Sequence, residues 1–400
     1  MRASNSICLM VTNEISATTF YRGYLSFLRE HGWDVSVVAS SNGMLAEFGR
    51  SEGVAAYDLQ MSRNPAPWSD LKAVINAVIL LRKIRPTTVV VATPKAALLG
   101  LMAAWITRVP VRIYQMWGLR LEAERGARRV LYTVLEKVAA RLATQVVANS
   151  PSLARAAQTL GIAPNIDVLG SGSSHGVDTS YFDRCCIDIP APGVVATNFM
   201  ARRPQAITVG YVGRVHQDKG IVDLLEAVKI CARNGLLVNL LVVGQSEDEV
   251  LEQLISDQNE AGLDVLRVGA VKDTRPFFLI MDMHCLPTHR EGFPNVVLEA
   301  ASLRVPTITT RATGSRDSVV PGVTGILVDV KSPPQLATAI QLLASDRTLR
   351  EEMAASARLH VVQNFQSSFV FALQEENLRE QRGRVATQKP LRSPRGGHAT

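Results

Sequence analysis

The sequence contains few cysteines, and their spacing follows no recognised pattern. Its 400 residues include Cys8, Cys185, Cys186, Cys231 and Cys285. Five cysteines give no complete disulfide framework, and none are spaced like the ligands of a zinc site. This composition excludes a small disulfide-stabilised protein, and we expect a protein of the reducing cytoplasm.

Long apolar runs and a secretory leader are also missing. The longest apolar runs, residues 74–81 and 96–106, fall short of the roughly 20 residues that span a bilayer. No early segment combines a basic region, an apolar core and a small-residue cleavage site. We therefore expect a soluble protein or one that attaches to a membrane surface.

The sequence has no recognisable cofactor or metal motif. The first expected strand, residues 7–11, is followed by residues 12–19, which lack the Gly-x-Gly-x-x-Gly turn of a dinucleotide site. Thr18 in this segment is expected to cap the next helix, and contact with an acceptor is the alternative. No Asp-x-Asp pair is placed to hold a divalent ion, so we expect neither a metal nor a cofactor.

Charge is unevenly distributed along the chain. Residues 63–141 carry fourteen Lys or Arg against four Asp or Glu, and residues 381–400 carry five basic side chains and no acid. The whole chain has a net charge of only +7, so the rest is acidic. This segregation indicates an anionic partner, either nucleic acid or an anionic membrane surface.

Short apolar segments alternate with stretches of helical spacing in both halves of the chain. The strands expected in the first half are 7–11, 35–39, 88–92, 111–114, 145–148 and 166–169. Those expected in the second half are 207–212, 240–243, 265–268, 283–286, 307–309 and 326–328. This alternation predicts an α/β protein with two Rossmann-like domains, each built on a doubly wound parallel sheet.

The expected domains are separated by a Gly-, Ser- and Pro-containing connection. We expect a first domain over residues 1–180, a linker over 181–204 and a second domain over 205–365. A last helix over 366–380 and a disordered basic tail over 381–400 complete the chain.

Two carboxylates eight positions apart, Glu291 and Glu299, mark the most informative stretch. A buried strand ends at Leu286, and Pro294 suits the first turn of a helix that continues to about residue 303. Glu291 should therefore lie in a loop and Glu299 on the helix. The N–H groups at such a helix start favour a diphosphate or a sugar hydroxyl. For an arbitrary pair of glutamates, two solvated surface residues would be the better interpretation.

The surrounding motifs argue for the functional interpretation. They are Gly213-Arg214-Val215-His216-Gln217-Asp218-Lys219-Gly220, Leu241-Val242-Val243-Gly244, Gly314-Ser315-Arg316-Asp317 and Pro321-Gly322-Val323-Thr324-Gly325. In this order, and with seven residues between the two glutamates, they resemble retaining glycosyltransferase family 4, of the bacterial capsule and exopolysaccharide type. The resemblance implies the GT-B fold, in which two Rossmann-like domains face a cleft and the last helix returns to the first domain.

The resemblance also implies roles for individual residues. Arg214 and Lys219 would stabilise the departing nucleoside diphosphate, because Arg can bind a phosphate with two hydrogen bonds and Lys supplies a point charge. Glu291 would bind the donor sugar and Glu299 the ribose. The other donor-site residues would be Gly213, Gly244, Val271, Gly292, Phe293, Pro294 and Asn295.

One position departs from the family pattern. The family often has a His-Gly pair after a strand of the first domain, where this chain has Trp117 and Gly118. These two residues are assigned to the acceptor side. Because Trp117 replaces the histidine, we assign no catalytic histidine, although His175, His216 and His289 are close to the motifs in sequence.

The basic region suggests where the protein works. Residues 124–142 are expected to form a helix with an apolar face toward the core and with Arg125, Arg128 and Arg129 on another face. A solvated surface helix is a competing interpretation. The family's use of lipid-linked acceptors favours contact with the anionic inner face of the cell membrane.

We therefore expect a cytoplasmic, peripherally membrane-associated glycosyltransferase. It would move a sugar from a nucleotide donor, most simply a UDP-sugar, to a lipid-linked saccharide acceptor in exopolysaccharide, capsule or cell-surface glycan biosynthesis. The alternatives are a UDP-sugar epimerase of similar fold and a non-catalytic nucleic-acid-binding protein. The sequence lacks a recognition-helix motif and basic repeats rich in aromatics, so no nucleic-acid partner is expected.

Overall fold

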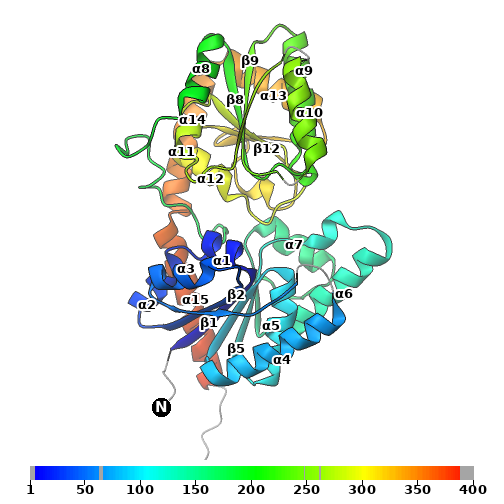
Figure 1. Cartoon of the computed structure of the whole chain (residues 1–400), viewed down its shortest axis with the longest axis vertical. Helices are drawn as coiled ribbons and strands as arrows, with labels where there is room; N and C mark the ends of the chain where they lie inside the picture. The colour runs from blue at the N-terminus through cyan, green and yellow to red at the C-terminus, as the bar shows by residue number, and fades with distance from the viewer. Residues whose placement is uncertain (1–4, 63–65, 247, 261–262, 388–400) are drawn as a thin grey trace, which may run out of the picture. The chain divides into compact units, whose positions relative to one another are not determined.

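The chain forms two compact units (Figure 1). The computed structural model describes residues 5–62, 66–246, 248–260 and 263–387. The first unit contains the described residues up to Gln115, Val134–Val147 and the chain from Phe371, and the second contains Met116–Thr133 and Ala148–Val370. The expected first domain ran to residue 180, whereas the contacts place residues 116–133 and 148–180 in the second unit.

The first sheet has seven strands in the order β3-β2-β1-β4-β5-β6-β7. They are β1 (Ser6–Asn13), β2 (Asp34–Ser40), β3 (Ala55–Asp58), β4 (Thr88–Ala92), β5 (Val111–Met116), β6 (Gln145–Ala148) and β7 (Asp167–Val168). The pairs β1–β2, β1–β4, β2–β3 and β4–β5 are parallel. Strand β4 is buried throughout, as is usual for a central parallel strand with both faces covered.

The second sheet has six strands in the order β10-β9-β8-β11-β12-β13. They are β8 (Ile207–Val212), β9 (Val238–Val243), β10 (Asp264–Gly269), β11 (Met283–Leu286), β12 (Thr307–Thr310) and β13 (Gly325–Val328). All of the neighbouring pairs are parallel. Its core includes Leu224 and Val228 of one helix and Leu336 and Ile340 of another, all completely or almost completely buried.

Helices connect the strands of both sheets, and the longer ones have an apolar side toward the core. The helices from the first half are α1 (Glu14–Phe20), α2 (Tyr24–Glu30), α3 (Met44–Glu52), α4 (Pro67–Ile84), α5 (Pro94–Ile106), α6 (Gly126–Leu142) and α7 (Pro151–Thr159). Those that follow are α8 (Val194–Arg202), α9 (Ile221–Arg233), α10 (Glu249–Glu260), α11 (Arg275–Phe278), α12 (Asn295–Ser302), α13 (Pro333–Ser345), α14 (Arg347–Asn364) and α15 (Ser367–Thr387). The described residues also form the 3-10 turns η1 (Arg120–Ala123), η2 (Gln217–Lys219) and η3 (Ser315–Asp317).

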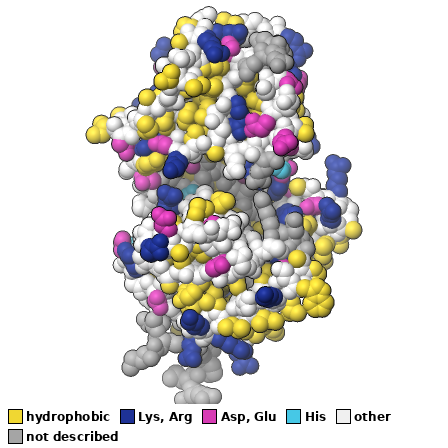
Figure 2. Space-filling view, viewed as in Figure 1, with side chains coloured by type: hydrophobic (Ala, Val, Ile, Leu, Met, Phe, Trp, Pro, Cys, Tyr) yellow, Lys and Arg dark blue, Asp and Glu magenta, His cyan; other side chains and the backbone are white. Residues whose placement is uncertain are grey.

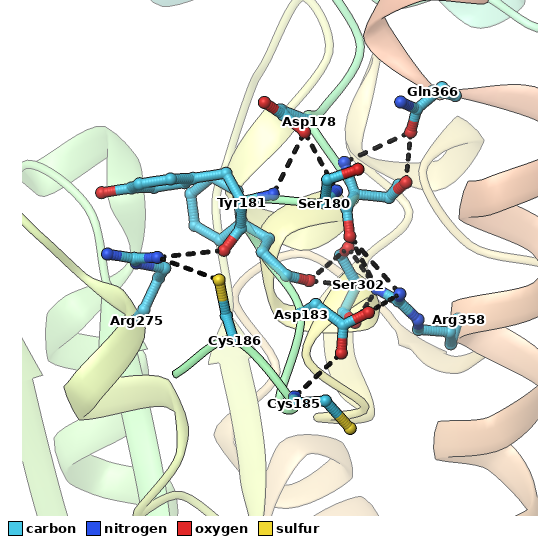
Figure 3. Close-up of polar contacts among 12 residues, drawn as sticks. Asp178, Ser180, Tyr181, Asp183, Cys185, Cys186, Arg275, Ser302, Arg358 and Gln366 are labelled. Atoms are coloured by element: carbon cyan, nitrogen blue, oxygen red, sulfur yellow. Dashed lines mark hydrogen bonds and ion pairs between the residues drawn. The ribbon is translucent and has the colours of Figure 1, made fainter. Parts of the chain in front are cut away.

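The expected linker is more ordered than its composition suggested. It contains α8, and the buried Arg275 and the partly buried Arg358 bind the segment before that helix (Figure 3). The Arg275 guanidinium donates to the Tyr181 carbonyl at 3.2 Å and lies 3.6 Å from the centre of its ring. Arg358 donates to the Phe182 carbonyl at 3.0 Å and to Asp183 at 2.6 Å. Residues 181–183 therefore belong structurally to the second unit.

The end of the last helix corrects a second expectation. Disorder was expected from residue 381, but α15 continues to Thr387. Its side chains pack within the first unit, where Leu378 and Gln381 are buried and the Arg382 guanidinium lies 5.4 Å from the centre of the Trp33 ring. Tertiary packing thus extends a segment whose composition alone favoured disorder. The remaining basic residues, 388–400, lie outside the described residues.

Candidate active site

Glu291 and Glu299 lie on either side of a loop-to-helix junction in the second unit. Strand β11 ends at Leu286, and α12 begins at Asn295. Glu291 is in the connecting loop and Glu299 is on the helix. Pro294 is the residue before the helix, not part of its first turn, and its backbone is extended.

Glu291 forms an ion pair with Lys219. Lys219 ends the 3-10 turn η2, which follows β8, and the two strands β8 and β11 are neighbours in the sheet. Both side chains are mostly buried, with 20% of Lys219 and 14% of Glu291 exposed. The carboxyl ends of neighbouring parallel strands meet at one edge of a sheet, and this arrangement brings the two residues together.

A second ion pair runs beside the first. The Arg290 guanidinium donates to Asp218 at 2.6 and 2.9 Å. Asp218 directly precedes Lys219 and Arg290 directly precedes Glu291, so two neighbouring ion pairs join the two loops. Burial raises the pKa of the Asp218 carboxyl, but the hydrogen bonds and charge of Arg290 outweigh that effect and leave it lowered. Asp218 therefore remains ionised and fixes Arg290 next to Glu291.

These residues line a pocket of about 120 Å³. Its walls are Trp117, Gly118, Leu119, Glu122, Arg214, Asp218, Lys219, Arg290, Glu291 and Gly292. Of these, Arg214 is exposed, and no acidic side chain in the described part of the chain pairs with it. The pocket thus presents an unpaired guanidinium next to a lysine and a carboxylate, which suits an anionic ligand that carries hydroxyl groups.

Close backbone contacts set the shape of this pocket. A Cβ atom on Gly292 would lie 1.9 Å from the Trp117 carbonyl oxygen, and Gly118 has a φ of +145°. Only residues without a side chain allow the two segments to approach so closely. The close contact between the backbones of residues 117–118 and Gly292, both in the second unit, therefore requires glycine at positions 118 and 292.

Glu299 lies outside this pocket and has no ion pair or hydrogen bond to any other described side chain. It keeps limited contact with solvent, yet the surrounding protein is dense enough that burial raises its pKa to about 7. A partly buried carboxyl without a partner differs from a fully solvated helix residue, and pKa shifts of this kind are frequent at functional sites.

Other predicted donor-site residues have structural contacts of their own. The Phe293 ring is buried 5.3 Å from the ring of Phe365. The Asn295 amide donates to the Gly176 carbonyl at 2.8 Å and contacts His175. Val271 packs at the edge of an apolar cluster in the second unit. We therefore assign the Phe293 and Asn295 side chains to holding the loop.

Two glycines in this group follow neighbouring strands. Gly213 donates to the Val243 carbonyl at 3.0 Å, and Gly244 donates to that of Gly269 at 2.7 Å. A Cβ on Gly244 would lie 1.9 Å from the Gly213 oxygen. Neither glycine lines the pocket, but together they set the path of the loop that carries Arg214.

Thr18 was expected to cap the first helix, but its position in the structure is different. It lies within α1, and its hydroxyl donates to the Ile15 carbonyl. The cap of α1 is Asn13, whose side chain accepts from the Ser16 N–H at 2.9 Å. The prediction that Thr18 caps a helix was wrong, because the helix starts directly after the strand.

The three histidines have separate environments. Burial lowers the pKa of His175 to about 4, so that its ring is neutral at pH 7. His289 contacts Asp223 at 2.7 Å, and His216 caps η2 by accepting from the Asp218 N–H. None of the three lines the pocket.

Sequence reasoning missed four pocket residues, Leu119, Glu122, Asp218 and Arg290. Asp218 and Arg290 were visible, since they directly precede Lys219 and Glu291 in the two motifs. Glu122 carries no motif: it lies in η1, far away in sequence, and accepts from the Thr313 hydroxyl at 2.8 Å. The Thr313 carbonyl also accepts from the Glu291 N–H at 3.0 Å, so Thr313 links the two glutamates.

Two doubly wound parallel sheets, with a pocket that contains Arg214, Lys219 and Glu291 after strands of the second, are the architecture of a glycosyltransferase of the GT-B type. Family models described as "Glycosyl transferase 4-like domain" and "Glycosyl transferases group 1" match residues 17–172 and 199–360. The Staphylococcus aureus capsular polysaccharide biosynthesis glycosyltransferase CapM is 36% identical over 358 residues, which cover 88% of this chain and 90% of CapM.

Two further matches extend the comparison. An Escherichia coli UDP-Gal:alpha-D-GlcNAc-diphosphoundecaprenol alpha-1,3-galactosyltransferase is 24% identical over 341 residues, or 83% of this chain and 85% of that protein. The structure of Anabaena HepE in complex with UDP has a TM-score of 0.74 at 18% identity and covers 94% of this chain and 100% of HepE. The chain belongs to glycosyltransferase family 4, among the glycosyltransferases of the capsular polysaccharide type.

Proposed function

We propose that this glycosyltransferase transfers a sugar from a UDP-sugar to a lipid-linked saccharide, with retention of the anomeric configuration, in capsule or cell-surface glycan biosynthesis. The observation that carries the proposal is the pocket in which Arg214, Lys219 and Glu291 meet. HepE has been solved with UDP and with UDP-glucose, and the Escherichia coli relative is named for a UDP-Gal donor and a diphosphoundecaprenol acceptor. These relatives favour the uridine nucleotide and the lipid-linked acceptor.

The donor diphosphate would bind at the basic side of the pocket. Arg214 has no acidic partner among the described residues, so its guanidinium is available to the phosphates. Lys219 would exchange part of its contact with Glu291 for a phosphate oxygen. As the bond between sugar and phosphate breaks, negative charge builds on the leaving diphosphate, and fixed cations stabilise that charge in a site that is partly shielded from water.

The two glutamates would hold hydroxyl groups at different parts of the donor. Glu291 is next to Lys219 and would accept from the sugar. Glu299, four residues after the start of α12, would accept from the ribose. Without a protein nucleophile assigned, retention is accounted for by attack of the acceptor on the face that the diphosphate leaves, with a phosphate oxygen taking the acceptor's proton.

The first prediction separates nucleotide binding from sugar transfer. Arg214→Ala should weaken UDP binding roughly tenfold to a hundredfold, because one charge-assisted contact contributes about 1.5–3 kcal/mol. Glu291→Gln should leave UDP affinity almost unchanged and depress turnover. Calorimetry with UDP, GDP and ADP measures the first effect, and transfer to an acceptor measures the second.

The matched control is Arg233→Ala, which removes an exposed arginine at the end of α9. It should change neither quantity. Transfer at the wild-type rate by the Glu291→Gln variant would show that the central assignment is wrong, and a preference for GDP or ADP would reject the uridine nucleotide alone.

We also propose that the protein works in the cytoplasm, at the inner face of the cell membrane. Arg125, Arg128 and Arg129 are all exposed, as expected for a face that meets anionic headgroups. No helix in the described ranges has both the length and the apolar content needed to cross a bilayer.

A further inference from the structure

Helix α4 of the first unit is apolar on two opposite faces. One face is the expected one: Ala73, Val74, Ala77 and Leu81 are buried against the unit's own core. The other carries Trp68, Leu71, Ile75 and Ile79, whose exposed fractions are 86%, 53%, 51% and 61%. Their spacing of three, four and four residues places them in one stripe along the helix.

This stripe is larger than scattered surface residues would explain. Isolated exposed apolar side chains are common, but a continuous patch marks a surface that contacts something apolar. A long exposed stripe that starts with a tryptophan is costly in water, and nothing in the fold of the first unit requires it. Figure 2 shows hydrophobic side chains gathered where α4 runs, with Lys and Arg beside them.

The charges around the stripe identify what covers it. Lys72, Arg82 and Lys83 are all exposed on the same helix, and the only acid between residues 66 and 85 is Asp70. Asp70 is paired with Lys95 of α5 at 2.6 Å and is mostly buried, so it does not offset the basic side chains. The exposed face of α4 is therefore apolar and positive.

Helix α5 adds a second exposed tryptophan to the same unit. Trp105 and Ile106 at its end are 58% and 43% exposed, and Arg108 follows them. Helix α4 ends four residues before β4 and α5 ends five residues before β5, so both helix ends lie at the edge of the sheet where these parallel strands begin. Tryptophan and basic residues together are typical of surfaces that lie at the level of lipid headgroups.

We propose that the stripe of Trp68, Leu71, Ile75 and Ile79 inserts into the outer part of an anionic lipid bilayer, with α4 parallel to the membrane plane. Its apolar side chains would enter the boundary between headgroups and acyl chains, while Lys72, Arg82 and Lys83 bind lipid phosphates. A second copy of the chain is a poorer occupant, because symmetric pairing would place like charges opposite one another.

This inference rests on the proposed work at a membrane but adds a separate mode of attachment. Attraction by exposed arginines alone is lost at high salt, whereas burial of apolar surface is not. The stripe therefore predicts a component of binding that survives at about 1 M salt, where the screening length is only about 3 Å.

The test compares vesicle flotation of the wild-type chain and of a variant with Trp68→Ser, Ile75→Ser and Ile79→Ser. Vesicles of phosphatidylcholine with roughly 30 mol% phosphatidylglycerol supply the anionic surface. We expect the variant to bind about tenfold more weakly and to lose the salt-resistant component. The matched control is Leu342→Ser with Leu359→Ser, which removes exposed leucines of α13 and α14 in the second unit and should float like the wild type.

Two further measurements distinguish failure of the membrane-insertion proposal from failure of the proposed transfer reaction. Quenching of tryptophan fluorescence by brominated lipid should fall when Trp68 is replaced by Phe, because that ring would no longer lie among the acyl chains. Flotation of the triple variant like the wild type, or lipid-free dimers that the variant abolishes, would overturn the proposal. Transfer to a water-soluble acceptor should be equal for both proteins, and its absence from both would instead count against the proposed reaction.

Discussion

At the scale of single residues, the site depends on how charges are paired. Lys219 and Arg290 each form an ion pair with a carboxylate. Arg214 and Glu299 form no ion pair with any described side chain. A charge without a partner contributes little to folding, and it is free to bind the proposed donor. Arg214 and Glu299 are accordingly the two residues whose environment should change most when a donor binds.

Glu299 gives the second prediction, which concerns pH. Its pKa is about 7 in the folded chain and near 4.5 in an unfolded one. The folded state therefore holds more protons between these values, and stability falls as pH rises from about 4.5 to about 7. Glu299→Gln should remove this loss and stabilise the protein at pH 8 by up to about 3 kcal/mol, less whatever its contact with water contributes.

Urea unfolding at pH 5 and pH 8 measures the effect. Glu136, which is buried beside Tyr114 and has a pKa raised to about 7, contributes to the same slope, so the variant should reduce the slope and not abolish it. Glu352→Gln, on the exposed side of α14, is the matched control. An unchanged slope in Glu299→Gln would show that this carboxyl is solvated.

The sequence could reveal those site residues that belong to local motifs, but not those brought to the site by contacts between distant parts of the chain. Lys219 and Glu291 were recognised from motifs, and their ion pair follows from neighbouring strands. Glu122 was missed because its place in the pocket depends on a contact with Thr313, 191 positions away. No local pattern encodes such a contact.

At the scale of elements, the close passage of two loops is the feature most sensitive to change. The third prediction is that Gly292→Ala displaces the loop 287–294, because the added Cβ would meet the Trp117 carbonyl. We expect a loss of about 1–3 kcal/mol of stability and a fall in turnover of at least about tenfold. Chemical unfolding and initial transfer rates measure the two effects.

A glycine without such a neighbour provides the control. Gly383 in α15 has nothing within 4 Å of an added Cβ, so Gly383→Ala should leave turnover unchanged and stabilise the helix slightly. Equal behaviour of the two variants would mean that the Trp117–Gly292 contact is not required.

The strands were predictable where they are buried. Strands such as β4 and β8 are continuous apolar runs, and their predicted limits were confirmed. Strand β3 was missed because it is four residues long and half exposed, so it has no such run. The extension of α15 and the binding of residues 181–183 by Arg275 and Arg358 depend on tertiary contacts that composition does not show.

At the scale of the whole molecule, the proposed chemistry requires no metal. The positive charge that opposes the leaving diphosphate would come from Arg214 and Lys219. The fourth prediction is therefore that transfer survives exhaustive treatment with a chelator. Activity is measured before and after dialysis against the chelator, and loss of activity that magnesium or manganese restores would reject the prediction.

The last prediction concerns the electrostatic part of membrane attachment. Residues 63–141 have an excess of ten positive charges, and exposed charges act over only about 8 Å at physiological ionic strength. Neutralising Arg125, Arg128 and Arg129 to Gln should therefore weaken flotation with anionic vesicles at low salt and reduce its salt dependence. UDP affinity should stay the same, because none of the three lines the donor pocket.

A separate variant without residues 388–400 measures how much the last basic residues contribute to vesicle binding. Neutral vesicles serve as the reference, since they offer no charge and only the apolar stripe of α4 should act on them. Transfer to a lipid acceptor should slow in step with the lost flotation, because the enzyme would meet its acceptor less often. If both variants float like the wild type at low salt, the basic residues form an ordinary solvated surface, and attachment rests on the apolar stripe alone.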